Sequence, residues 1–111
     1  MAIKAGEIYF TQKAVFGKST YGRPILILRV RGNTFHAAPF STKINLAEPG
    51  DLVIRTSDEG FDKTGLSEDS CLLHDRDFGG SLDFLKNADF MGAVFGPLKL
   101  RVEKWWGEPL A

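Results

Sequence analysis

Apolar residues in the first two thirds of the chain follow the pattern of β-strands bounded by glycine, proline and asparagine. The continuous run Ile25-Leu26-Ile27-Leu28 predicts a strand over residues 24–31 that is buried on both faces at the centre of the fold. Gly32-Asn33 is typical of a two-residue turn, so we expect a hairpin with a strand over residues 34–40. Further strands are predicted over residues 6–11, 51–56 and 70–75, and Gly79-Gly80 is expected to end the last segment.

Near the end of the chain, the apolar residues recur with the period of an α-helix. Leu98, Val102, Trp105 and Trp106 recur at helical spacing, with charged residues between them. Pro97 before this stripe and Gly107 after it are start and stop signals, so a helix is predicted over residues 97–106 with its apolar side on the sheet. Together the patterns predict a mainly β fold: a small, mostly antiparallel, barrel-like sheet with a C-terminal helix.

The composition excludes several classes of protein. The chain has 111 residues, with 14 Lys+Arg against 14 Asp+Glu, which predicts one globular domain over residues 1–111 and no overall attraction to nucleic acid. A single cysteine excludes an internal disulfide, and no Cys/His spacing predicts a metal site. Neither a signal peptide nor an apolar run of about 20 residues is visible, so a cytoplasmic protein without membrane contact is expected.

Three segments follow one another in a specific order and spacing: Gly6-Glu7-Ile8-Tyr9-Phe10, Gly22-Arg23-Pro24-Ile25-Leu26-Ile27-Leu28 and Ala38-Pro39-Phe40-Ser41-Thr42-Lys43. Together they resemble the MazF/PemK family of type II toxin–antitoxin ribonucleases. A looser match continues through Gly65-Leu66-Ser67-Glu68-Asp69-Ser70 to Asp75. The chain departs from the family at Ser41, where threonine is usual, at Asp75-Arg76-Asp77-Phe78, and in its C-terminal helix.

The resemblance implies an SH3-like small β-barrel, of the kind shared by MazF, PemK and CcdB, with a C-terminal helix. It also implies an endoribonuclease that cleaves single-stranded RNA by attack of the ribose 2′-hydroxyl, with no metal or other cofactor. A homodimer and a cognate antitoxin with an acidic tail are the partners that it implies.

Three residues are the catalytic candidates: Arg23, Ser41 and Asp75. Arg23 matches the family's functional arginine, and a guanidinium suits the charged oxygens of a phosphorane. Ser41 can donate its hydroxyl proton to a phosphate, although a strand-end hydroxyl more commonly bonds its own backbone. Asp75 shares a predicted strand face with Cys71 and Leu73, where it could act as a base or be an ordinary strand-end carboxylate.

RNA-binding candidates surround these residues: Thr42, Lys43, His74, Arg76 and Lys18, with Lys13, Phe16 and Tyr21 as further contacts. Scattered solvated charges are the alternative interpretation of the cations. His36 is expected to be a hydrogen-bonded sheet residue, and Trp105 and Trp106 to pack the helix or a dimer.

Two other functions stay open. The chain could be a non-catalytic nucleic-acid-binding or regulatory member of the same fold, because its Asp75–Phe78 region is altered. It could also be a small-barrel protein-interaction domain that binds extended peptides at a sheet edge.

Overall fold

The computed structural model describes residues 2–12 and 22–110, which form a mainly β structure with one C-terminal helix. The strands are β1 (Glu7–Thr11), β2 (Arg23–Arg31), β3 (Thr34–Ser41), β4 (Leu52–Ile54), β5 (Ser70–Leu72), β6 (Phe78–Ser81) and β7 (Asp89–Ala93). The helix α1 spans Gly96–Trp106, and three short 3-10 segments are η1 (Ile44–Leu46), η2 (Phe61–Lys63) and η3 (Leu82–Leu85).

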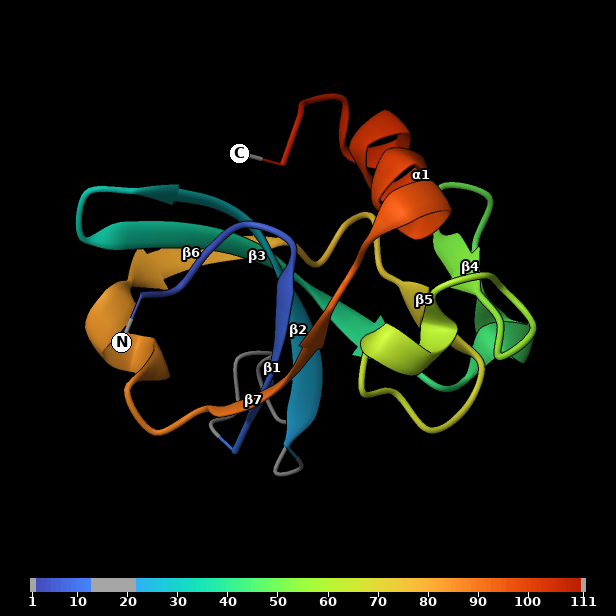
Figure 1. Ribbon diagram of the computed structural model, residues 1–111, viewed down its shortest axis with the longest axis horizontal. Helices are drawn as coiled ribbons and strands as arrows, with labels where there is room; N and C mark the ends of the chain where they lie inside the picture. Colours follow the sequence, from blue (N-terminus) through green and yellow to red (C-terminus); the bar gives the residue numbers. More distant parts are fainter. Residues whose placement is uncertain (1, 13–21, 111) are drawn as a thin grey trace.

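All strand pairs are antiparallel, and the sheet curls into half a barrel in the order β4-β5-β3-β2-β1-β7 (Figure 1). The β2–β3 hairpin forms at Gly32-Asn33 as predicted, with its turn at one side of the molecule (Figure 1). β3 joins two parts of the sheet, because its first half pairs with β6 and its last two residues pair with β5. The strand-rich fold with a C-terminal helix is therefore confirmed at this level.

The central strand β2 is buried on both faces, as its apolar run predicts. Leu26 and Leu28 face a core that includes residues of α1, whereas Ile25 and Ile27 face a second core that includes Leu85 of η3. All four β2 side chains are at most 1% exposed. Period-two alternation thus places opposite faces of one strand in two separate apolar clusters.

Helix α1 lies against the first of these cores. Pro97 is in its first turn, and Gly107 closes it in the left-handed region at φ 90°, with its N–H donating to Glu103 O at 2.7 Å. Leu98 and Val102 are buried, and Trp105 and Trp106 pack against the same core. The predicted helix, its signals and its apolar stripe are confirmed.

The second half of the sheet differs from the prediction. β5 ends at Leu72. Two residues later the His74 N–H donates to the Asp51 carboxylate at 3.0 Å and not to a neighbouring strand, so the pairing does not continue. Strand alternation therefore does not reach Asp75, and the prediction that it shares a strand face with Cys71 and Leu73 is wrong. Gly79 and Gly80 do not end a segment but lie inside β6, which pairs with β3.

Candidate functional site

The strand register brings Arg23 and Ser41 to the same end of neighbouring strands. Ile25 of β2 pairs with Pro39 of β3, so continuing this register by two residues places Arg23 opposite Ser41. Ser41 pairs in turn with Cys71 of β5, and Arg23 pairs with Thr11 of β1. Paired residues point to the same face of an antiparallel sheet, so Arg23 and Ser41 form one polar row across the end of the sheet.

Pro24 explains why the sheet opens at this end. A proline has no N–H to give to a ladder, and it restricts the preceding residue, Arg23, to an extended backbone. The β2–β3 ladder accordingly begins at Ile25, while the last two residues of β3 pair along their other edge with β5. Arg23 and Ser41 therefore lie just beyond the end of the β2–β3 ladder, at the same end of the two strands.

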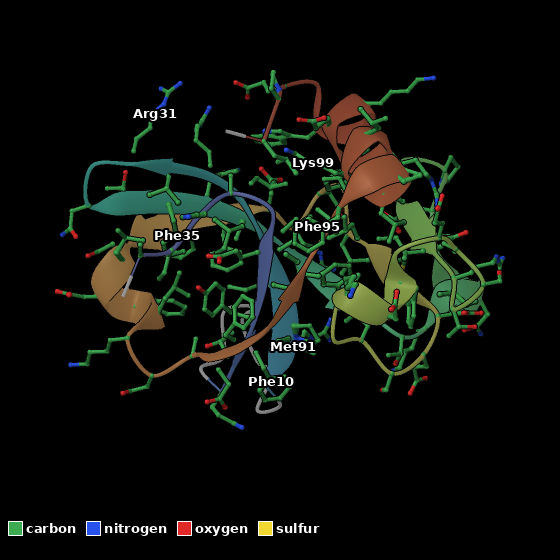
Figure 2. The ribbon with its side chains drawn as sticks, viewed as in Figure 1. Phe10, Arg31, Phe35, Met91, Phe95 and Lys99 are labelled. Atoms are coloured by element: carbon green, nitrogen blue, oxygen red, sulfur yellow. The ribbon has the colours of Figure 1, made fainter. Side chains whose placement is uncertain are left out.

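A cavity of about 180 Å³ lies at this end of the sheet, and we call it the strand-end cavity. Pro24 and Phe40 line it, so the alternation of side chains places Arg23 and Ser41 on the opposite face of the sheet. The walls of the cavity are Phe10, Pro24, Phe40 and Thr42 on one side and Leu66, Ser67, Glu68, Ser70 and Met91 on the other. Figure 2 shows Phe10 and Met91 close together at this end of the molecule. Thr42, Ser67 and Glu68 also line an open groove of about 380 Å³, so the cavity continues outward along a polar surface.

Ser41 already has one local partner. Its Oγ accepts a hydrogen bond from the backbone N–H of Lys43 at 3.2 Å, which fixes the turn that carries Thr42 and Lys43. This bond uses an acceptor lone pair and leaves the hydroxyl proton available for donation. Thr42 and Lys43 are exposed beyond the strand end.

The sequence motif over residues 65–70 builds part of the wall of the strand-end cavity. Asp69 accepts the Thr56 N–H at 2.7 Å, and the Ser70 hydroxyl donates to Glu68 O at 2.9 Å. Gly65 approaches β7 so closely that a Cβ there would overlap the carbonyl of Met91. These contacts give the motif a structural role and leave Glu68, which is exposed on the cavity wall, as an acidic group that the sequence did not single out.

His74 belongs to a second polar cluster, with Asp51. The Asp51 carboxylate is 3% exposed, and its Oδ1 lies 2.5 Å from His74 Nδ1. This hydrogen bond raises the pKa of His74, and the charges of Asp51, Asp75 and Glu48 add to the effect. Burial alone would raise the pKa of Asp51, but hydrogen bonds from the N–H of Glu48 and from the His74 ring and N–H lower it.

The same cluster anchors the helix and surrounds Cys71. Trp105 Nε1 donates to Gly50 O at 2.8 Å, and a Cβ on Gly50 would collide with the His74 ring. Burial, followed by the charge of Asp51, raises the pKa of the Cys71 thiol. Nothing in the sequence pattern signals this cluster, because Asp51 and His74 are far apart in the chain.

The remaining candidates lie apart from the Arg23–Ser41 row. Asp75 and Arg76 are exposed beyond β5, 3.8 Å apart at Oδ1 and Nε. His36 contacts Asp77 at 2.7 Å through Nε2 and stacks on Trp106, consistent with the expected sheet role. Lys18, like Lys13, Phe16 and Tyr21, lies outside the described residues.

Two negative findings concern the described part of the chain. Within residues 2–12 and 22–110, no three His, Cys, Asp or Glu side chains are grouped so as to hold a metal ion. No helix in these same residues has the length and apolar character needed to cross a membrane.

Comparison with protein families and with curated proteins adds no relative. No family model matches the chain, and no curated protein matches it significantly in sequence.

Proposed function

We propose that the chain is an endoribonuclease toxin with the SH3-like barrel of the MazF/PemK/CcdB type. The observation that carries the proposal is the register of β2 and β3, which brings Arg23 and Ser41 to the same end and the same face of the sheet. The same two residues are those that the resemblance to the family marks as functional. Single-stranded RNA is the proposed substrate, and a homodimer and an antitoxin are the proposed partners.

The proposed reaction needs only groups that can hold and move protons around one phosphate. The ribose 2′-hydroxyl gives its proton to a base and its oxygen attacks the adjacent phosphorus. The bond to the 5′-oxygen breaks and that oxygen takes a proton from water, so a 2′,3′-cyclic phosphate and a 5′-hydroxyl result. Arg23 stabilises the charge that develops on the phosphorane oxygens, and the Ser41 hydroxyl donates to one of them. Asp75 remains the proposed base for the 2′-hydroxyl, although its exposed turn after β5 lies apart from the Arg23–Ser41 row.

Thr42 and Lys43 continue the proposed site along the open groove, where Thr42 lines the wall. Their exposed side chains can contact the sugar–phosphate backbone on either side of the scissile bond. His74 and Arg76 are proposed to bind RNA further out, together with Lys18.

A paired substitution tests this proposal. Purified Arg23→Ala and Ser41→Ala proteins should lose at least about a hundredfold of the cleavage rate on single-stranded RNA, as removal of one oxyanion donor does in other enzymes. Arg55→Ala and Ser57→Ala are the matched controls, because both residues are exposed and away from the strand-end cavity. Equal activity of Arg23→Ala and Arg55→Ala would refute the assignment of Arg23.

One observation favours a second candidate, a module that binds extended peptides. β6 pairs with β3 alone among the described strands, and beside it lies an apolar cavity of about 450 Å³ lined by Phe35, Phe78, Gly79, Gly80, Ser81 and Phe84. A strand edge next to aromatic pockets is a common peptide-binding arrangement. In that case Arg23→Ala would leave the function of the protein intact, which separates the two candidates.

A further inference from the structure

A β-bulge near the end of β2 turns two arginines to the face of the sheet that α1 covers. Ile27 pairs with Ala37 but Arg29 pairs with His36, so Leu28 is an extra residue in β2. After an inserted residue the alternation of faces is reversed. Val30 accordingly packs in the second core, whereas Arg29 and Arg31 face the other way.

The two arginines share a small cavity with residues across the hairpin. Arg29, Arg31, Thr34, Phe35 and His36 line a space of about 120 Å³, and no acidic residue lines it. This is room for roughly four water molecules, which suits a single tetrahedral anion better than a nucleobase. Figure 2 shows Arg31 extending from the hairpin on the side opposite Phe35.

The side chains of this cavity are not equally engaged. The Arg29 guanidinium lies 3.4 Å from the Glu108 carboxylate and 5.9 Å from the centre of the Trp106 ring. The side chains of Arg29 and Glu108 are both exposed. His36 is held between Asp77 and Trp106, and the Thr34 hydroxyl donates to Arg31 O at 2.9 Å. The guanidinium of Arg31 makes no hydrogen bond or ion pair with any residue that the structure describes.

We propose that this cavity is an anion site that takes one phosphate group, a monoester or a diester. Arg31 supplies the main contact through its planar fork, and Arg29, steadied over Trp106, supplies the second. Glu108 on Arg29 is a weak competitor, because it is an exposed ion pair that a phosphate can replace. The site lies at the other end of β2 from Arg23 and on the other face, so it is independent of the proposed cleavage site.

The test is a titration of the full chain with inorganic phosphate at constant ionic strength, followed by NMR. The backbone amides of Thr34 and His36 and the arginine side-chain Nε–H signals should shift together and saturate. Arg31→Ala should weaken this binding roughly tenfold, as expected for the loss of a charged hydrogen bond. Arg55→Ala is the control, since it removes another exposed guanidinium outside the cavity and should leave the affinity unchanged.

A second arm identifies the source of the phosphate. If the group belongs to a nucleic acid, Arg31→Ala should also weaken binding of a short single-stranded RNA whose scissile 2′-hydroxyls are replaced by hydrogen. If RNA binding is unchanged while inorganic phosphate binding is lost, the ligand is a free phosphate compound. Shifts that do not saturate, or equal losses in Arg31→Ala and Arg55→Ala, would overturn the proposal, whatever the outcome of the cleavage assay.

Discussion

The contact between Asp51 and His74 shows how one ion pair ties two distant loops together. The Asp51 carboxylate is almost fully buried, while the His74 imidazole remains more than one third exposed. Asp51 receives the N–H groups of Glu48 and His74 as well as the ring, so it organises the chain on both sides of the contact. The pair should therefore affect stability as a function of pH.

The pH dependence has a definite sign. Because the pKa of His74 is raised by folding, its contribution is present below the ordinary histidine value of about 6.5 and disappears as pH rises through the folded pKa. Because the pKa of Asp51 is lowered, its contribution is present above about 4 and disappears as pH falls through the folded pKa. Urea unfolding measured between pH 4 and 9 should show that the free energy of unfolding falls less steeply above about pH 6.5 in His74→Gln than in the unsubstituted protein. The same dependence of the unfolding free energy on pH in His74→Gln and in the unsubstituted protein would contradict this role of His74.

Position 92 in β7 has to be glycine, because the backbone of another segment lies too close to leave room for a side chain. A Cβ at this position would overlap the backbone of Lys63 and Thr64. We expect Gly92→Ala to lower the free energy of unfolding by about 3 kcal/mol, since backbone has to move to make room. Gly80→Ala is the control, because its Cβ would meet only the Phe35 ring at 3.4 Å, and it should cost less than about 1 kcal/mol. Equal losses in urea unfolding would show that β7 can shift freely.

At the scale of elements, α1 contributes through one face only. Leu98 is 1% exposed in the core, whereas Leu100, two residues on, is 66% exposed. Leu98→Ala should cost about 2–5 kcal/mol and Leu100→Ala at most about 0.5 kcal/mol, measured by chemical unfolding. A large loss for Leu100→Ala without any change in oligomeric state would mean that the helix packs on another face.

Local signals were enough to predict some elements and not others. The apolar run of β2, the Gly32-Asn33 turn and the proline and glycine that bound α1 act within a few residues, and all three predictions are confirmed. β6 was missed because Phe78-Gly79-Gly80-Ser81 has no apolar alternation and is held in place by pairing with β3. The bulge at Leu28 and the early end of β5 depend on partners elsewhere in the chain, so no local pattern announces them.

The candidate site divides in the same way. Arg23 and Ser41 lie in short segments that the sequence could single out, and the register places them across from each other. The patterns around Glu68 and Asp51 gave neither residue a role, because their positions follow from how loops 48–51 and 65–70 fold against the sheet. Sequence reasoning thus reached the strand-end residues but not the groups that the loops bring in.

At the scale of the whole molecule, exposed apolar side chains bear on the proposed dimer. Phe90, Phe95 and Leu100 are each more than half exposed, although Trp105 and Trp106 pack on the chain's own core. Contiguous apolar patches commonly mark interaction surfaces, whereas single exposed apolar residues are ordinary. Light scattering at micromolar concentration should show a species of twice the 12.3 kDa chain mass. Phe95→Ser should shift it toward the monomer, and a monomer in the unsubstituted protein would refute the dimer.

The most direct test of the central claim is cleavage of a defined single-stranded RNA by the purified chain in the presence of a chelator. The account predicts products with a 2′,3′-cyclic phosphate and a 5′-hydroxyl, at a rate unaffected by the chelator. It also predicts that replacing the 2′-hydroxyl at the cleaved linkage by hydrogen stops the reaction, because the nucleophile is then gone. An RNA pool of mixed sequence that stays uncut by the protein with Arg23 and Ser41 intact would contradict the account.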